Sequence, residues 1–505
     1  MMKIYSTHQV KQIDDYTIKH EPIRSIDLME RAAEALFFRC IKIIPPTSPV
    51  AVYCGPGNNG GDGLAVARML LLSGFHVQVY FIDSKSYSPD FEVNLSRLKA
   101  LGLCFPVQIA YEHQLVTHNK NTYIVDALFG SGLSRPLDGI AKHVVNHINQ
   151  QKKRVIAIDI PSGLFGDDNP YPNPNSVVKA DVTLTLQFPK MSFFFAENQG
   201  FVGSVDVVPI GLHQLALENT PSSYFMVEQR DVAVMLPPRQ KFSHKGSFGH
   251  ALVIAGKVGM MGAASFAISG CIKAGAGLVT AHIPRSGLQI VQTAIPESIV
   301  SLSNADLEID TIPDVSRYSA VCVGPGIGIS ALTLNMLESL ISSAHSLPLV
   351  IDADALNLIA ANVNLLSGLG NGAILTPHPG EFDRLFGRSS CGEDRLSKGV
   401  RYARELGVTI VIKGANTQVV SPLGEVFFIP VGNAGMATGG SGDVLSGIIT
   451  SLLAQGLEPT KAAIAGAYVH GVSGDIAAAI KGQLSLSATD IVSCIPSAFK
   501  QIATI

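Results

Sequence analysis

Short runs of β-branched and other apolar residues alternate with longer amphipathic segments through the first half of the chain. The apolar runs at 50–53, 77–82, 124–125 and 155–158 predict strands, and helical spacing follows at 64–72 and 91–101. Ser6 and Gln9 form a capping-box pattern ahead of a helix, and a second helix is expected from Ser25. This alternation is typical of a parallel sheet with covering helices.

The second half repeats the same pattern after a polar, proline-bearing stretch at 217–223. Strands are expected at 252–255, 320–323, 349–351, 373–375 and 409–412, and a connecting helix and turn at 231–238. The pattern therefore predicts an α/β protein of two three-layer α/β/α domains, 1–220 and 225–505, with a junction near 220–235. Both are expected to be doubly wound, and the first to be Rossmann-like.

Composition narrows the classes of partner. The 505 residues include 37 Lys and Arg against 40 Asp and Glu, a net charge of -3, so no cationic surface for nucleic acid or anionic lipid is expected. Charged residues make up 15% of the chain and hydrophobic residues 47%, which suits buried parallel sheets and argues against disorder.

Membrane and secretory classes are disfavoured as well. Charge-free stretches at 318–337 and 355–380 are long enough to span a bilayer, but Gly and Asn residues interrupt both, and a Pro also interrupts the first. The first residues lack the apolar core of a signal peptide, and the seven Cys contain no CxxC pair. We therefore expect a cytoplasmic protein with reduced thiols and no structural zinc site.

The first candidate site is the run Gly-Pro-Gly-Asn-Asn-Gly-Gly-Asp-Gly at 55–63, between a predicted strand and a predicted helix. It contains GxGxxG, and Asp83 follows the next strand where a Rossmann site has its ribose-binding carboxylate. On that motif alone, a dinucleotide site and a tight packing turn are equally good interpretations. Two Asn and an Asp favour polar recognition, since a packing turn does not need them.

Two further strand ends carry polar residues to the same predicted edge of the sheet. Asp126 lies in Val-Asp-Ala-Leu-Phe-Gly-Ser-Gly, and Asp159 and Ser162 lie in Asp-Ile-Pro-Ser-Gly. Because the carboxyl ends of parallel strands line the ligand crevice, Asp126 and Asp159 should face one pocket with Asn59. Oxygen ligands from Asn59, Asp126 and Ser162 suit an alkali or alkaline-earth cation better than zinc. The segment 165–170 that follows has no assigned function.

Taken together, these three motifs resemble the YjeF N-terminal family, whose enzymes are NAD(P)H-hydrate epimerases. The resemblance covers about the first 215 residues. It implies that potassium is held by Asn59, Asp126 and Ser162, and that Asp159 touches the hydrate near the reacting carbon, with an acid or base role. It further implies that the hydrated nicotinamide nucleotide is bound by Asn58, Asn59, Gly60, Gly61, Asp62, Gly130, Ser131, Gly132, Leu133, Ser134, Arg135, Pro136 and Asp159.

The second candidate site is a glycine-rich run at 433–447 that leads into an apolar helix predicted at 444–453. Backbone N–H groups at a helix start can bind an anion such as a transferring phosphoryl group. Asp443 at the start of that helix can accept a proton from an attacking hydroxyl. Phosphoryl transfer needs little else from the protein than positioning and charge stabilisation.

The Gly-Gly-Ser-Gly-Asp run resembles the GxGD element of the ribokinase-like superfamily. Five ordered motifs, at 241–246, 275–279, 352–356, 376–381 and 413–417, look more specifically like NAD(P)H-hydrate dehydratases, from about 225 to the C-terminus. Without the resemblance, a turn residue is an alternative interpretation of His378 and a solvated strand end is one of Lys413, although the position of Lys413 before Gly-Ala-Asn favours a phosphate contact. The resemblance implies a ribokinase-like second domain in which Asp443 is the base and also contacts the hydrate. It implies that the hydrate site is lined by Ala263, Gly326 and His378. It further implies that the nucleotide is held by Lys413, Gly414, Ala415, Asn416, Thr417 and Gly442.

The two resemblances together imply a bifunctional NAD(P)H-hydrate repair enzyme, in which an epimerase converts the R hydrate to S and a dehydratase returns S to NAD(P)H. The order of the domains implies ADP as phosphoryl donor with release of AMP and phosphate, although no residue decides between ADP and ATP, and magnesium is expected with either. The alternatives are a ribokinase-superfamily small-molecule kinase with an N-terminal nucleotide-binding module, a dehydrogenase, and a first domain that only binds. The expected partners are small molecules, with no nucleic acid or membrane, and a homo-oligomer is compatible with the sequence.

Overall fold

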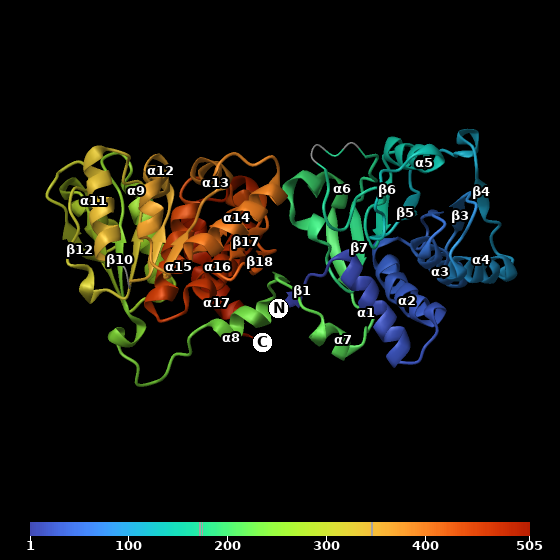
Figure 1. Cartoon of the computed structure of the whole chain (residues 1–505), viewed down its shortest axis with the longest axis horizontal. Helices are drawn as coiled ribbons and strands as arrows, with labels where there is room; N and C mark the ends of the chain where they lie inside the picture. The colour runs from blue at the N-terminus through green and yellow to red at the C-terminus, as the bar shows by residue number, and fades with distance from the viewer. Residues whose placement is uncertain (171–172, 174, 345–346, 505) are drawn as a thin grey trace. The chain divides into compact units, whose positions relative to one another are not determined.

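A computed structural model describes residues 1–170, 173, 175–344 and 347–504. The chain divides into two compact units, which are coloured and labelled along the chain in Figure 1. The N-terminal unit is Lys3–Ser222, and the C-terminal unit is Ser223–Ile505 together with Met1–Met2.

The N-terminal unit is built on a seven-stranded parallel sheet. Its strand order is β4 (Val107–Ile109), β3 (Val77–Ile82), β2 (Val50–Cys54), β5 (Tyr123–Ala127), β6 (Arg154–Ile158), β7 (Val182–Leu186) and β8 (Ser204–Val208). Strand β2 pairs with β3 on one side and with β5 on the other. The chain therefore changes direction along the sheet between β2 and β5, which is the position where doubly wound folds bind their ligands.

Helices cover both faces of this sheet because alternate strand residues point to opposite sides. Val50, Val52 and Cys54 of β2 pack with α2 (Ser25–Ile43), α3 (Asn58–Leu72) and α4 (Pro89–Leu101). Ala51 and Tyr53 pack on the other face with α5 (Gly139–Gln150). The helix predicted after Ser6 is α1 (Thr7–His20), with the predicted capping box present. The unit also contains α6 (Gln199–Val202) and α7 (Gln214–Asn219), whose last three residues belong to the polar stretch at 217–223.

The C-terminal unit contains most of an eleven-stranded sheet. The order is β1 (Met2–Lys3), β9 (Tyr224–Met226), β18 (Val426–Ile429), β17 (Thr417–Val420), β16 (Thr409–Ile412), β15 (Ala373–Leu375), β14 (Leu349–Ile351), β13 (Ala320–Val323), β10 (His250–Ile254), β11 (Leu278–Ile283) and β12 (Ile299–Leu302). Strand β17 runs antiparallel to both β16 and β18, so the sheet is mixed where the pattern suggested a parallel one. Strand β10 pairs with both β11 and β13, which is the corresponding change of direction.

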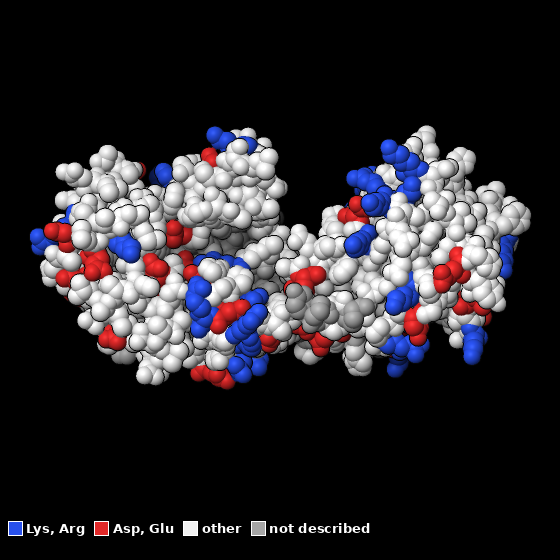
Figure 2. Space-filling model, turned by 90° about the horizontal axis from the view of Figure 1, so that it is seen from above, with Lys and Arg blue, Asp and Glu red and all other residues white. Residues whose placement is uncertain are grey.

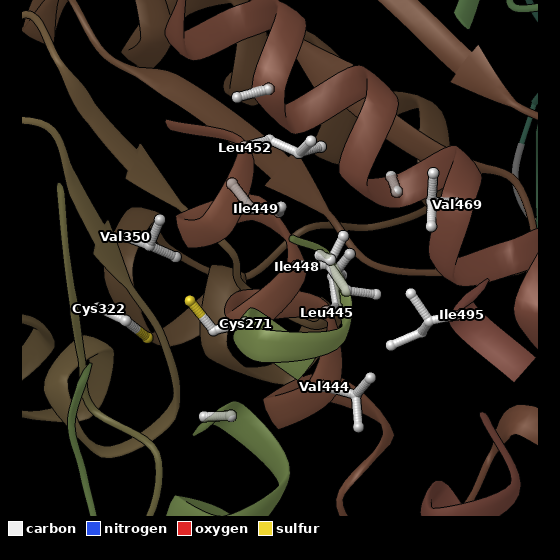
Figure 3. Packing of buried hydrophobic residues seen from close by; sticks show 14 of the residues in the cluster. Cys271, Cys322, Val350, Val444, Leu445, Ile448, Ile449, Leu452, Val469 and Ile495 are labelled. Atoms are coloured by element: carbon white, nitrogen blue, oxygen red, sulfur yellow. The ribbon is translucent and has the colours of Figure 1, made fainter. Parts of the chain in front are cut away.

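One large apolar core supports this sheet. Helix α15 (Ser441–Ala454) lies in it with α9 (Met261–Lys273), α16 (Pro459–Lys481) and α17 (Ala488–Ile502), and Figure 3 shows Ile448, Ile449 and Leu452 of α15 among their neighbours. The remaining helices are α8 (Gln229–Met235), α10 (Leu288–Ala294), α11 (Ala331–Ser343), α12 (Ala353–Ala361), α13 (Pro379–Phe386) and α14 (Gly392–Leu406).

Helix α16 is the one helix of the described residues that is long and apolar enough to cross a membrane. Two thirds of its apolar window (67%) is buried, and it packs against α15 and α17. It is thus a core helix of the C-terminal unit, and its hydropathy is explained by that burial. The stretches at 318–337 and 355–380 are each divided between strands, loops and helices.

The cysteines, all of which the structure describes, form no disulfides, and the surface carries charges of both signs (Figure 2). All seven cysteines are free, and six of them are buried. On the face seen in Figure 2, basic and acidic side chains are scattered among uncharged ones.

Candidate active sites

The glycine-rich run at 55–63 forms the turn between β2 and the start of α3. Gly60 is required for packing, because a Cβ atom there would lie 1.8 Å from the carbonyl oxygen of Gly55. Gly57 caps the helix without a side-chain hydrogen bond, so the first N–H groups of α3 have no side-chain acceptor from their cap. Asn58 is exposed, whereas Asn59 and Asp62 are buried. The packing role therefore applies to Gly60, and the polar recognition predicted for Asn58, Asn59 and Asp62 stays a prediction.

Asp126 and Ser162 are joined at the ends of β5 and β6. The Ser162 hydroxyl donates to Asp126 Oδ1 at 2.7 Å, and the Ser162 backbone N–H donates to Oδ2 at 2.8 Å. Both residues are fully buried. Burial raises the pKa of Asp126 to about 6 in spite of these hydrogen bonds, which stabilise the ionised form.

Gly130 brings the remaining predicted residues of this site together. A Cβ atom on Gly130 would lie 3.2 Å from Asp159 Oδ2 and 3.3 Å from Asn59 Cβ. The backbone N–H of Ser131 donates to Asp159 Oδ2 at 3.0 Å, and that of Phe129 donates to the Ser162 hydroxyl at 2.8 Å. The loop after β5 therefore contacts both other segments of the predicted site, and its tip, from Gly132 to Pro136, is largely exposed.

Asp159 forms an ion pair with Lys190, which lies outside every motif found in the sequence. Lys190 Nζ lies 2.7 Å from Asp159 Oδ1, and the two side chains are 4% and 11% exposed. Burial on its own would raise the pKa of Asp159, but Lys190 and the Ser131 N–H hold it below its usual range. Asp159 also has a left-handed backbone, with φ of +65°, which is uncommon outside glycine and occurs at constrained sites.

Two more carboxyl groups surround this ion pair. Asp14 of α1 is half-buried, and burial together with the charge of Asp159 raises its pKa to about 7. Asp62 is buried near the same groups, and its pKa is raised well above the usual value by burial and by Asp159 and Asp14. Lys190 and Asp14 were not predicted, because no motif or spacing marks them. Asp83, considered as a ribose ligand, is exposed and bonded to Gln108.

The segment at 165–170 has a structural role at this edge. The Asp167 carboxylate accepts from the backbone N–H of Thr7, the first residue of α1, at 3.0 Å. Asn169 exchanges hydrogen bonds with the backbone of Phe165. This segment therefore fixes the start of α1 beside the predicted site.

In the C-terminal unit, the predicted hydrate-site residues Ala263 and Gly326 lie at the change of direction between β10 and β13. A Cβ atom on Gly326, where φ is +62°, would lie 3.0 Å from Ala263 Cβ. The Gly256 N–H donates to the Pro325 carbonyl at 2.8 Å and ties the two loops together. The close contact explains why a residue without a side chain is needed at 326.

Asp443 lies in the first turn of α15, directly after the glycine-rich run. Gly440 begins the helix in a left-handed conformation, with φ of +90°, and supplies no side-chain cap. Burial, and then the charge of Asp352, raises the pKa of Asp443 to about 7. A carboxyl group of this kind can exchange a proton near neutral pH, as a general base requires.

Lys413 lies beside Gly442 in a network of carboxylates. Its Nζ is 2.8 Å from Asp352 Oδ1, 3.7 Å from Glu381 Oε2, and 3.4 Å from where a Cβ on Gly442 would be. Burial would lower the pKa of Lys413, but Asp352 and Glu381 hold it above its usual value. The Ser446 hydroxyl of α15 donates to Asp352 Oδ2 at 2.6 Å. Lys413 is thus a positioned cation, and the interpretation as a solvated strand end is wrong.

The rest of the predicted nucleotide segment, Gly414 to Thr417, forms the turn between β16 and β17, where the Thr417 hydroxyl and Gly414 bond each other. His378 caps α13 by accepting from the Gly380 N–H at 3.0 Å, and its side chain is 51% exposed. His378 therefore has the helix-capping role of a turn residue while its ring also faces solvent.

Two side chains of α16 support the glycine-rich run and were not predicted. Asp475 accepts from the Gly432 N–H and from Asn433 Nδ2, both at 2.9 Å. His470 Nε2 shares a 3.2 Å hydrogen bond with the Ser441 hydroxyl, and burial lowers the pKa of His470 to about 4. His470 is therefore neutral at physiological pH.

Comparisons with known proteins match a different family model in each unit. Residues 251–497 match the family model of NAD(P)H-hydrate dehydratase, and residues 25–192 match that of the YjeF-related protein N-terminus. A ribokinase-like superfamily protein of Enterococcus faecalis V583 is 27% identical with a TM-score of 0.51, over 57% of this chain and 99% of that one. The predicted α/β fold class is confirmed.

Relatives match along nearly the whole chain. The bifunctional NAD(P)H-hydrate repair enzyme Nnr of Moorella thermoacetica is 33% identical over 523 residues, covering 99% of this chain and 97% of that protein. Its counterpart in Escherichia coli is 35% identical over 472 residues, covering 92% and 88%. The family predicted from the motifs is confirmed, and the chain belongs to the bifunctional NAD(P)H-hydrate repair enzymes.

Proposed function

We propose that the N-terminal unit interconverts the R and S epimers of hydrated NADH and NADPH, and that the C-terminal unit dehydrates the S form with ADP as phosphoryl donor. The observation that carries this proposal is that each unit has a glycine-rich helix start close to a carboxyl group whose pKa is raised to about 7, Asp14 in the N-terminal unit and Asp443 in the C-terminal unit. Such helix starts bind phosphate groups, and such carboxyl groups move protons.

In the N-terminal unit, the hydrate binds to Asn58–Asp62, to the loop at 130–136 and to Asp159. Potassium would be held by Asn59, Asp126 and Ser162, whose amide, carboxylate and hydroxyl oxygens are the hard ligands that such an ion prefers. The buried Asn59 Nδ2 has no hydrogen-bond partner among the described residues, and this N–H donor would bond an oxygen of the hydrate, which leaves the amide oxygen for the ion. The potassium ion would supply positive charge close to the negatively charged hydrate.

In the C-terminal unit, Asp443 accepts the proton of the hydrate's hydroxyl while the hydroxyl oxygen attacks the terminal phosphorus of the nucleotide. Phosphate is a much better leaving group than hydroxide, so its departure and the loss of a proton from the adjacent carbon restore the double bond of NAD(P)H. Lys413 and the N–H groups at Gly442 stabilise the charge that develops on the phosphoryl oxygens. Magnesium would bind with the nucleotide, whose phosphates are its usual ligands.

The test supplies the purified chain with a mixture of R and S hydrates of NADH, potassium and magnesium, and adds ADP or ATP in separate reactions. We expect complete recovery of the reduced-nicotinamide absorbance with ADP, and formation of AMP and phosphate. Recovery that stops at the S fraction, after correction for spontaneous epimerisation, would contradict the epimerase role. No recovery with either nucleotide would favour the small-molecule kinase, and recovery with ATP alone would overturn the donor.

The proposed substrates also indicate where the enzyme acts and which molecules it binds. Reduced nicotinamide nucleotides and ADP are small cytoplasmic metabolites, so we propose a cytoplasmic enzyme whose partners are these molecules. Fractionation of cells followed by immunodetection of the chain tests this location.

A further inference from the structure

Helix α1 brings Asp14 to the epimerase site. Thr7 at the start of α1 faces Gly166 and, through it, Ser131: a Cβ atom on Gly166 would lie 2.8 Å from Thr7 Oγ1 and 3.4 Å from Ser131 Cβ. Asp14 follows Thr7 by seven residues, which is two helical turns, so both lie on the same face of α1. The neighbouring Ile13 is buried in a cluster with Phe188, two residues before Lys190. Asp14 therefore faces Asp159 and Lys190.

The carboxyl groups here outnumber the cations. Asp14 is influenced by Asp159, Lys190 and its own neighbour Asp15, and Asp62 of α3 lies close enough to Asp14 to interact with it. Lys190 Nζ forms an ion pair with Asp159 Oδ1 at 2.7 Å, and it also donates to two backbone carbonyl oxygens at 3.3 and 3.5 Å. Among the residues that the structure describes, no cation forms a comparable ion pair with Asp14, so binding a proton is the simplest way to neutralise it.

These surroundings separate the two carboxyl groups by proton affinity. The Lys190 ion pair keeps the pKa of Asp159 low, whereas burial and the Asp159 charge raise the pKa of Asp14 to about 7. When neighbouring groups are pushed apart in this way, the one with the neutral pKa is suited to acid–base work and the other to holding charge.

We propose that Asp14 is the catalytic acid–base group of the epimerase and that Lys190 is a positioning residue, which holds Asp159 ionised beside the reacting carbon. This inference rests on the proposed epimerase function and deepens it by naming the group that moves the proton.

The step balances without any oxidant or further reactant. Hydration of the enamine of NAD(P)H places the hydroxyl on the ring carbon next to the ring nitrogen. The C–O bond breaks as the nitrogen lone pair forms C=N⁺, and the leaving oxygen takes the Asp14 proton to become water. Asp159 faces the cation that results. Water then adds to the other face, the electron pair returns to nitrogen, and the proton returns to Asp14.

The test compares Asp14→Asn with Asp15→Asn in the full chain, starting from pure R hydrate with ADP, magnesium and potassium. Asp15 is the exposed neighbour on the same helix and has the same charge. General acid–base groups contribute about 10²–10⁴-fold, so we expect Asp14→Asn to lower kcat for R hydrate at least ~100-fold with little change in KM. Asp15→Asn should stay within about twofold of the wild type.

Dehydration of S hydrate by the same preparations should be unchanged, which shows that the C-terminal unit is intact, and an unchanged KM for R hydrate shows that the N-terminal unit of the variant still folds and binds. Asp14→Glu keeps a carboxyl group and should restore part of the lost kcat for R hydrate. In Asp14→Asn, the change of this rate with pH near neutrality should disappear. A normal R-hydrate rate in Asp14→Asn overturns the inference. An inactive wild type with R hydrate refutes the epimerase function instead, so the two failures are distinguishable.

Discussion

At the scale of single residues, burial and neighbouring charge set different proton affinities on chemically identical carboxyl groups. Burial raises the pKa of Asp443 to about 7 and that of Asp126 to about 6, while Lys190 outweighs burial and lowers the pKa of Asp159. The two carboxyl groups for which we propose proton transfer, Asp443 and Asp14, are those whose pKa is raised to about 7.

Removing the base of the dehydratase should abolish one activity and spare the other. Asp443→Asn keeps the size of the side chain but cannot accept the hydroxyl proton, so we expect kcat for S hydrate to fall by about 10²–10⁴-fold. Glu338→Gln, on the exposed face of α11, is the matched control and should leave the rate unchanged. Near-normal dehydration by Asp443→Asn would mean that another group is the base.

The pH dependence of dehydration follows from the same residue. A base acts only when ionised, and a carboxyl group with a pKa of about 7 loses its charge as the pH falls through 7. We therefore expect kcat/KM for S hydrate to decrease about tenfold from pH 8 to pH 6. Initial rates at constant ionic strength measure this, and a flat profile over that range is incompatible with Asp443 as the titrating base.

At the scale of elements, α16 is both a core helix and the support of the catalytic loop. Its apolar residues belong to the main core of the C-terminal unit, while His470 and Asp475 bond Ser441, Gly432 and Asn433. The glycine-rich run is therefore held from behind by side chains that are anchored in a rigid helix.

Removing the side chain of Asp475 should destabilise the glycine-rich run and weaken substrate binding more than it slows the chemical step. Asp475→Ala leaves the Gly432 N–H and Asn433 Nδ2 without their acceptor, so we expect the C-terminal unit to lose about 1–3 kcal/mol of unfolding free energy and the KM for S hydrate or ADP to rise. Asp475→Asn keeps one acceptor and should lie between alanine and the wild type. Urea denaturation with dehydratase kinetics checks both, and an unchanged midpoint and KM in the alanine variant would count against the support role.

The elements were predictable to the extent that their patterns are local. Strands β13, β14, β15 and β16 have the predicted bounds, because short apolar runs between turn residues mark buried parallel strands. The antiparallel pairing of β17 with β16 and β18 was not predicted, since the short turns at 413–416 and 421–425 that join these three strands were not taken as hairpin connections. Likewise Lys190 follows an irregular segment and Asp14 lies in an ordinary amphipathic helix, so only the folded chain brings them to Asp159.

At the scale of the whole molecule, the two units have separate apolar cores. The core of α9, α15, α16 and α17 contains residues of the C-terminal unit, and the clusters around β2 contain residues of the N-terminal unit. A substitution that inactivates one site should therefore leave the other unit folded. We therefore predict that the two successive activities of the chain can be disabled one at a time.

The most direct measurement follows pure R hydrate of NADH with the wild-type chain and with Asp443→Asn, in potassium, magnesium and ADP, by absorbance and by chromatographic separation of the epimers. The wild type should return all of the hydrate to NADH faster than spontaneous epimerisation allows. Asp443→Asn should bring R and S to equilibrium at the wild-type rate while forming almost no NADH. If the wild type consumes R hydrate no faster than it epimerises spontaneously, the claim that one chain repairs both epimers is contradicted.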